Sequence, residues 1–372
     1  MISNSYSDAW KAIIRPQREN YTEASLGNHI FFIGGKKFQR TDYTLKNQRG
    51  MPLSCSYFEP VDNTRVAKQL PCVIYLHGNT SSRLEALPYI RLLLPSNITL
   101  FCFDTSGSGL SGGEYISLGW WEREDLKAVI KFLKKTGRVS KIGLWGRSMG
   151  AVTALMHAER DPSISGIILD SPFSDLRKLI GYIGGVLMPR IPNFVRSTLI
   201  WFVKHSVKSR ANFNIDDVSP LNYVENITIP AQFIVATGDT FIPPAHGIEL
   251  YDKYGGVKSL LKVSGNHNTD RPVHVMSSIY DFFFRVLEVE KLPGCKVVSL
   301  QESNMEGFSQ VVFPVVKVLK QKNILNDDLD VIDISNPETQ TSFLFEPEEE
   351  MNMAIKLSLK TYDEEKKKRE IT

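Results

Sequence analysis

Cysteine is scarce in this sequence of 372 residues, which contains only Cys55, Cys72, Cys102 and Cys295. These cysteines are widely scattered and show no CxxC spacing, which excludes a disulfide scaffold and a cysteine-rich zinc site. No HExxH or other metal-ligand spacing occurs, so we predict no metal and no cofactor. Scattered cysteines fit a reducing compartment, and we expect a cytoplasmic protein.

A clear excess of charge of either sign is also missing. Lysine and arginine together number 44, aspartate and glutamate 41, and the net charge is +3. Proteins built to hold nucleic acid usually carry a clear basic excess, so we predict no nucleic-acid partner. No uncharged apolar run reaches the ~18 residues of a membrane-spanning helix, and the first residues show no secretory signal. We therefore predict no transmembrane segment.

Short apolar runs alternate with helical patterns through most of the chain. Strands are predicted at residues 37–46, 51–59, 72–76, 98–103, 142–145, 164–169, 232–236 and 259–263, and helices at 122–135, 149–160 and 271–289. This alternation predicts an α/β fold, with a mostly parallel central sheet and helices on both of its faces. Residues 171–229 are too long for a simple crossover, and they are apolar, helical and basic. We predict that they form a helical cap inserted after the sixth strand.

The pattern changes near residue 290, where Pro293-Gly294 ends the last predicted helix. We predict one α/β domain at residues 1–290, with the cap at about 171–229. Residues 291–345 alternate short apolar and acidic pieces, which is typical of a partly ordered linker. Residues 346–370 are predicted to form an amphipathic helix.

The strongest chemical motif is Gly146-Arg147-Ser148-Met149-Gly150, which has the form GxSxG. It follows one predicted strand and opens a predicted helix, which is the setting of a nucleophile elbow. In such an elbow the serine occupies a tight, strained turn, and glycines allow the neighbouring backbone to approach closely. The motif therefore predicts Ser148 as a nucleophile.

A serine nucleophile needs a histidine base that is oriented by an acid, and the usual chain order in this setting is Ser, Asp or Glu, then His. Asp239 follows the strand predicted at 232–236, and His267 follows the strand predicted at 259–263. Because parallel strands end at one edge of a sheet, both side chains are expected near Ser148. Asp170 also follows a strand and stays open as a displaced acid, although a role in bracing a loop is the favoured interpretation.

Acyl transfer also needs backbone donors for the oxyanion that forms on the substrate. We predict that the N–H of Met149 is one donor and that the N–H of Asn79, in His77-Gly78-Asn79, is the second. His77 is expected to hold that loop in shape. The sequence from Gly107 to Gly112 reads GxGxxG, but no helix follows at once, which argues against a dinucleotide site.

These motifs resemble those of the α/β-hydrolase superfamily over about residues 30–290. Gly146 to Gly150, Gly238-Asp239 and Asn266-His267 are similar to the serine-aminopeptidase-like, or monoacylglycerol-lipase-like, branch. The sequences at 145–150 and 169–176 resemble a group of plant and protist hydrolases in that branch. The resemblance implies an α/β-hydrolase fold and a triad of Ser148, Asp239 and His267. More distant similarity to membrane-anchored depalmitoylases does not extend to their anchoring, because no cysteine precedes Cys55.

The end of the chain carries a second motif. An acidic run that includes Glu349 and Glu350 precedes Met351, Ala354 and Ser358, which share one face of the predicted helix. This pattern resembles a ubiquitin-interacting motif, which implies ubiquitin as a partner. The resemblance implies Ala354 at the centre of the contact and Ser358 bonded to the partner's backbone. A solvated amphipathic helix is the alternative.

The leading functional interpretation is a serine hydrolase of an acyl ester or thioester, with a small acyl substrate and possible recruitment to ubiquitin by the tail. A serine peptidase shares the triad and stays open, as does a catalytically idle hydrolase fold that binds ubiquitin as an adaptor. Apolar cap residues such as Trp201 either line an acyl pocket or pack the cap on the domain. The basic charge of the cap favours an anionic head group or peripheral contact with a membrane surface.

Overall fold

The computed structural model describes residues 9–187 and 193–294. The chain divides into two units, Met1–Glu302 and Ser303–Thr372, and all described residues belong to the first. The predicted linker at 291–345 lies almost entirely outside the described residues, and the predicted tail helix at 346–370 lies wholly outside them.

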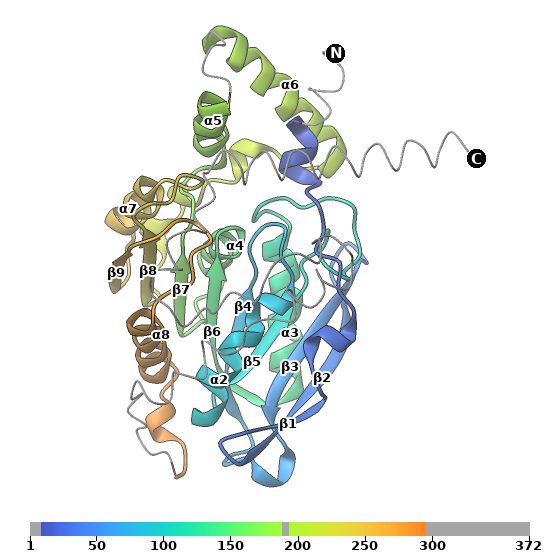
Figure 1. The fold of residues 1–372 in the computed structure, drawn as a ribbon, viewed down its shortest axis with the longest axis vertical. Helices are drawn as coiled ribbons and strands as arrows, with labels where there is room; N and C mark the ends of the chain where they lie inside the picture. The colour runs from blue at the N-terminus through green and yellow to red at the C-terminus, as the bar shows by residue number, and fades with distance from the viewer. Residues whose placement is uncertain (1–8, 188–192, 295–372) are drawn as a thin grey trace, which may run out of the picture. The chain divides into compact units, whose positions relative to one another are not determined.

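A nine-stranded sheet forms the centre of the first unit, in the order β1-β2-β3-β5-β4-β6-β7-β8-β9 (Figure 1). The strands are β1 (Ile30–Ile33), β2 (Lys36–Lys46), β3 (Pro52–Pro60), β4 (Leu70–Leu76), β5 (Thr99–Phe103), β6 (Val139–Arg147), β7 (Gly166–Asp170), β8 (Ala231–Ala236) and β9 (Lys258–Val263). The first three strands pair antiparallel, β3 pairs antiparallel with β5, and the remaining pairs from β5 to β9 are parallel. The mostly parallel sheet is as predicted.

Helices cover both faces of this sheet. The helices labelled in Figure 1 are α2 (Ile90–Leu93), α3 (Glu122–Thr136), α4 (Met149–Ala158), α5 (Leu176–Leu187), α6 (Asn193–Ala211), α7 (Pro244–Lys253) and α8 (Val273–Val286), of which α5 and α6 lie beyond the sheet, and a 3-10 helix at Arg83–Tyr89 precedes α2. Apolar side chains of α3, α4 and α7 pack in one cluster with Cys72, Ile74 and Leu76 of β4. The alternate side chains of the sheet point the other way, where Trp145 of β6 contacts Phe283 of α8. This alternation explains why the central strands read as continuous apolar runs.

Strand β1 and the 3-10 helix at Arg83–Tyr89 are among the elements that the sequence did not predict. Strand β1 has only four residues, and its outward side chains are partly exposed, so it lacks the buried run that marks the central strands. It adds one strand before the predicted ones, so the cap follows the seventh strand, β7, instead of the sixth. The 3-10 helix at Arg83–Tyr89 contains Pro88, and the sequence gives no helical period there.

Helices α5 and α6 form the cap and project beyond the edge of the sheet at which the parallel strands end (Figure 1). The base of the cap is apolar and packed, because Leu176, Leu179 and Val203 join a cluster with Met156 of α4. Trp201 is different, since 61% of its surface is exposed. Leu176, Leu179 and Val203 therefore pack the cap on the domain, which was one of the two interpretations, whereas Trp201 is largely exposed.

Candidate active site

Ser148 occupies the turn between β6 and α4, with the backbone angles φ 52° and ψ −117°. This conformation is strained for a residue with a side chain. A Cβ atom on Gly150 would lie 2.0 Å from the carbonyl oxygen of Leu76, and one on Gly146 would lie 2.3 Å from the carbonyl oxygen of Gly150. Because these are backbone contacts, only glycine fits at either position, and the strand–turn–helix setting is as the sequence predicted.

Asp239 and His267 are joined by a hydrogen bond of 2.6 Å between Oδ2 of the carboxylate and Nδ1 of the imidazole. The other oxygen, Oδ1, accepts the backbone N–H groups of Phe241 at 3.0 Å and Ile242 at 2.8 Å. Only 1% of the Asp239 side chain is exposed. Since the carboxylate accepts at both oxygens, Nδ1 carries the proton, and Nε2 is left as an acceptor.

Ser148 and His267 lie at the same edge of the sheet, after β6 and β9. The side chain of Arg147, the residue before Ser148, donates from Nη2 to the carbonyl oxygen of His267 at 3.0 Å. Within residues 9–187 and 193–294, no hydrogen bond joins Ser148 to His267, whose imidazole bonds to Asp239. Bonds of this kind are often long in unliganded enzymes and tighten only when substrate binds.

The two predicted oxyanion donors border Ser148. The N–H of Met149 belongs to the first turn of α4, where N–H groups have no partner within the helix. A Cβ atom on Gly78 would lie 3.8 Å from Cβ of Ser148, so the loop that holds Asn79 passes beside Ser148. The N–H of Gly78 is already occupied, because it donates to Oε2 of Glu85 at 2.9 Å.

His77 is 1% exposed and braces the same loop. Its Nε2 accepts the backbone N–H of Thr105 at 3.1 Å, so Nδ1 is the protonated nitrogen and donates to the carbonyl oxygen of Gly78 at 2.7 Å. Both ring nitrogens are used, which agrees with the structural role expected from the sequence.

The Asp170 carboxylate accepts hydrogen bonds from Arg271 instead of from His267. Nε of Arg271 lies 2.9 Å from Oδ2, and Nη2 lies 2.7 Å from Oδ1. The structure therefore favours Asp239 over Asp170 as the acid partner of the histidine, and Asp170 has the bracing role.

Sequence reasoning missed Glu85, Arg147 and Arg271 in this region. Arg147 Nη1 lies 3.1 Å from Oε1 of Glu85, and both side chains are largely buried. Burial alone would raise the pKa of the Glu85 carboxyl, but the Arg147 guanidinium and the Gly78 N–H hold it below its usual value. The only sequence signal was an arginine inside the GxSxG motif, and its partner lies 62 residues away.

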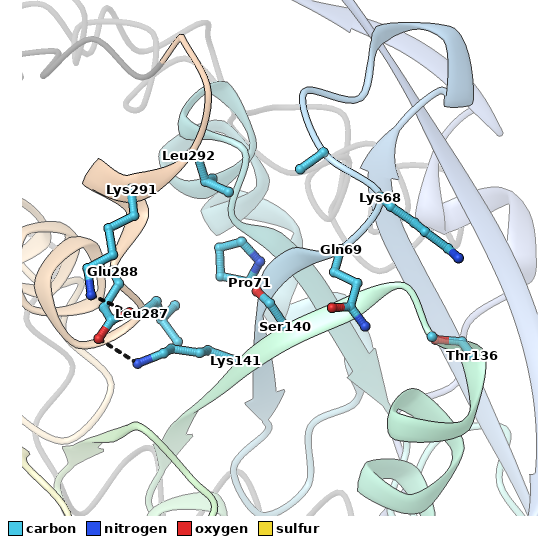
Figure 2. A pocket seen from close by; sticks show the side chains of 12 residues that line it. Lys68, Gln69, Pro71, Thr136, Ser140, Lys141, Leu287, Glu288, Lys291 and Leu292 are labelled. Atoms are coloured by element: carbon cyan, nitrogen blue, oxygen red, sulfur yellow. Dashed lines mark ion pairs between the residues drawn. The ribbon is translucent and has the colours of Figure 1, made fainter.

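A hollow of about 720 Å³ lies at the opposite edge of the sheet, near the amino ends of β4 and β6. Figure 2 shows its lining, in which Lys141 and Lys291 both pair with Glu288 at 2.9 Å. It contains none of the predicted site residues. Within residues 9–187 and 193–294, no group of three or more metal-ligating side chains gathers, and no helix has the length and apolar character needed to cross a membrane.

Comparisons with known proteins agree with this fold. The family described as "Serine aminopeptidase, S33" matches residues 67–220, and the family described as "PhoPQ-activated pathogenicity-related protein" matches residues 191–327. The protein YqkD of Bacillus subtilis is 30% identical over 243 residues, which cover 64% of this chain and 76% of YqkD. The lysophosphatidylserine lipase ABHD12 of Danio rerio is 26% identical over 197 residues, which cover 51% of this chain and 49% of that protein.

Among solved structures, the esterase Pf2001 of Pyrococcus furiosus superposes with a TM-score of 0.54. It is 27% identical in sequence, and the match covers 73% of this chain and 99% of the esterase. The fold, the elbow and these likenesses show that the chain is a hydrolase of the α/β-hydrolase superfamily and belongs to its serine aminopeptidase (S33) family.

Proposed function

We propose that this protein is a serine hydrolase that cleaves an acyl ester or thioester through Ser148, His267 and Asp239. The observation that carries the proposal is the 2.6 Å bond between Asp239 and His267, at the edge of the sheet where the Ser148 elbow lies. A buried carboxylate bonded to Nδ1 fixes the tautomer in which Nε2 can accept a proton. That is the state a general base needs.

The reaction then follows from the roles of these groups. Oγ of Ser148 attacks the acyl carbon while Nε2 of His267 takes the hydroxyl proton, and Asp239 stabilises the imidazolium that forms. The N–H groups of Met149 and Asn79 donate to the oxyanion. His267 returns the proton to the leaving alcohol or thiol, and water attacks the acyl-enzyme by the same route to release the acid.

An acyl substrate is supported by the names of two similar proteins, one an esterase and one a lipase. The cap adds two features that suit a lipid surface, since Trp201 is 61% and Phe202 is 46% exposed beside basic residues. A tryptophan side chain has one polar end and favours membrane interfaces, and the exposed Phe202 adds apolar surface beside it. We therefore include in the proposal peripheral contact with a membrane and an acyl chain of lipid length. We also propose that this protein belongs to the plant and protist group of hydrolases.

Labelling with a fluorophosphonate probe tests the nucleophile directly. We expect the wild type to label and Ser148→Ala not to label. The control is Ser163→Ala, which removes an exposed serine at the opposite edge of the sheet and should label as the wild type does. A series of p-nitrophenyl esters and acyl thioesters then gives the preferred chain length, and an aminoacyl amide substrate tests for peptidase activity. Absence of labelling in every variant would contradict the proposal.

Ubiquitin binding by the tail is a separate proposal, because Glu349, Glu350, Met351, Ala354 and Ser358 lie outside the described residues. It rests on the sequence pattern alone. We expect the full chain to bind ubiquitin and Ala354→Arg to abolish binding, with Ser148→Ala as the control that binds normally. If the chain bound ubiquitin but did not label with the fluorophosphonate probe, a catalytically idle adaptor would be favoured. If ubiquitin showed no saturable binding, the tail would be a solvated amphipathic helix.

A further inference from the structure

The loop that carries His267 is held by two arginines. Arg147 donates from Nη2 to the backbone oxygen of His267 at 3.0 Å. Arg271 donates from Nη1 to the backbone oxygen of Thr269 at 2.9 Å. The loop itself is mostly exposed. Its own hydrogen bonds, from the N–H groups of Asn268 and Thr269 to Oδ1 of Asn266, fix its turn, and the contacts with the residues beneath it fix its place over the sheet edge.

The first arginine is anchored on a buried carboxylate. Arg147 Nη1 donates to Oε1 of Glu85 at 3.1 Å, and Oε2 of Glu85 accepts the N–H of Gly78 at 2.9 Å. The Glu85 side chain is 11% exposed and that of Arg147 is 24% exposed. One guanidinium, on the residue next to Ser148, thus joins the loop of His267 to the loop of Asn79.

The second arginine is anchored in the same way. Arg271 binds both oxygens of Asp170, and the two side chains are 4% and 6% exposed. The backbone oxygen of Asp170 accepts the N–H of Ser148 at 2.8 Å. This pair therefore connects the His267 loop to the nucleophile turn from the other side.

We propose that Arg147 and Arg271 are positioning residues that set the distance between His267 and Ser148, and that Arg147 also sets the Asn79 loop through Glu85. The proposal rests on the proposed function. A planar guanidinium can bind a carboxylate and a carbonyl oxygen at fixed angles, which an ammonium group cannot do. Because the bond between Ser148 and His267 is not already closed, these anchors decide whether it can form.

The kinetic test uses substitutions that keep the charge. Arg147→Lys and Arg271→Lys should each lower kcat by about 100-fold with KM nearly unchanged, because a displacement of about 1 Å at the reacting groups has an effect of that size. Arg285→Lys is the matched control, since Arg285 is an arginine of α8 that donates to the carbonyl oxygen of Asp281 at 3.2 Å. It should keep the wild-type kcat.

A double substitution tests the chain from Arg147 to Gly78. Glu85→Gln alone should also lower kcat. Glu85→Gln combined with Arg147→Lys should be no slower than the slower single variant, because both changes interrupt the same connection. If the fold-loss of kcat in the double variant equalled the product of the two single losses, the two residues would act separately. That result would overturn this part of the proposal.

Amide hydrogen exchange of the full chain separates this proposal from the proposed function, since it needs no activity. Arg147→Lys should speed exchange at residues 77–81 and 264–270, whereas Arg271→Lys should speed it at 264–270 only. This pattern would support the anchors even if Ser148 failed to label with the fluorophosphonate probe. Unchanged exchange at 264–270, a uniform increase over the whole chain, or an unchanged kcat in an active enzyme would overturn the proposal.

Discussion

Replacement of Asp239 by asparagine tests the proposed mechanism most sharply, because the structure dictates how the new amide must lie. Oδ1 of Asp239 accepts the N–H groups of Phe241 and Ile242, and Oδ2 accepts Nδ1 of His267. An asparagine keeps both backbone bonds only if its oxygen takes the Oδ1 position. Its NH2 group then faces Nδ1 of the imidazole.

That orientation reverses the tautomer of His267. Nδ1 must accept from the amide, so the proton moves to Nε2, which can no longer take the proton of Ser148. If the asparagine amide took the opposite orientation, its NH2 group would face the N–H groups of Phe241 and Ile242. Each of these two donors would then lose its acceptor, which costs about 1–3 kcal/mol of stability. We expect kcat of Asp239→Asn to fall by about 10⁴-fold, or about 5 kcal/mol in the activation barrier.

Steady-state hydrolysis of p-nitrophenyl acetate between about pH 6 and 9 measures the loss, because the base must be neutral to act. Thermal unfolding is the control for structure. Asp239→Asn should unfold near the wild-type temperature, whereas Asp239→Ala should unfold earlier, since it also loses the bonds to Phe241 and Ile242. Retention of about a tenth or more of the wild-type kcat in a folded Asp239→Asn enzyme would refute the tautomer argument.

Four further predictions concern stability. Gly150→Ala should destabilise the protein by about 3 kcal/mol or more, because the new Cβ would lie 2.0 Å from the backbone oxygen of Leu76. Gly181→Ala, in α5 with open space around it, should be neutral or stabilising in the same thermal unfolding assay. Ser148→Gly should be more stable than Ser148→Ala by about 1 kcal/mol, since glycine adopts φ 52° without strain; equal melting temperatures would contradict this. Burial lowers the pKa of His157 to about 4, so the unfolded chain binds its proton more tightly. The free energy of unfolding should therefore fall by up to about 3 kcal/mol as the pH drops from about 6.5 to 4, and denaturant titrations should show a weaker fall in His157→Leu.

The nucleophile turn could be predicted from the sequence because its determinants are local. Gly146 and Gly150 are required by contacts within a few residues or with the adjacent strand, and they lie at fixed offsets from Ser148. Asp239 and His267 could be predicted for a related reason. Each directly follows an apolar run, and parallel strands end at a common edge.

The residues that support this turn could not be predicted, because their meaning depends on a distant partner. Arg147 pairs with Glu85 and Arg271 pairs with Asp170, over 62 and 101 residues of chain. In the sequence, Asp170 and Asp239 look alike, because each is an aspartate that follows a predicted strand. Only the fold shows that one carboxylate meets an arginine and the other a histidine.

The order of the strands explains why the His267 loop needs anchors at all. The loop leaves β9, and Ser148 ends β6, so two strands lie between them, and three strand spacings amount to about 14 Å. His267 is four residues beyond Val263, the last residue of β9, and four extended residues reach about 13 Å. These residues do not run straight, since Oδ1 of Asn266 accepts the N–H groups of Asn268 and Thr269, so the backbone of the loop covers only part of that distance.

The hydrogen bonds within the loop, from the N–H groups of Asn268 and Thr269 to Oδ1 of Asn266, fix its turn but not its place over the sheet. Its contacts with the sheet edge occur strand by strand. Above β8, the N–H of Gly238 donates to the carbonyl oxygen of Gly265 at 2.9 Å. At the end of β7, Asp170 holds Arg271, and at the end of β6, Arg147 holds the His267 carbonyl oxygen. The two arginines thus lie where the topology leaves the loop without backbone partners. Their buried charges are tolerated because each is paired with a carboxylate that the adjacent strand or 3-10 helix supplies.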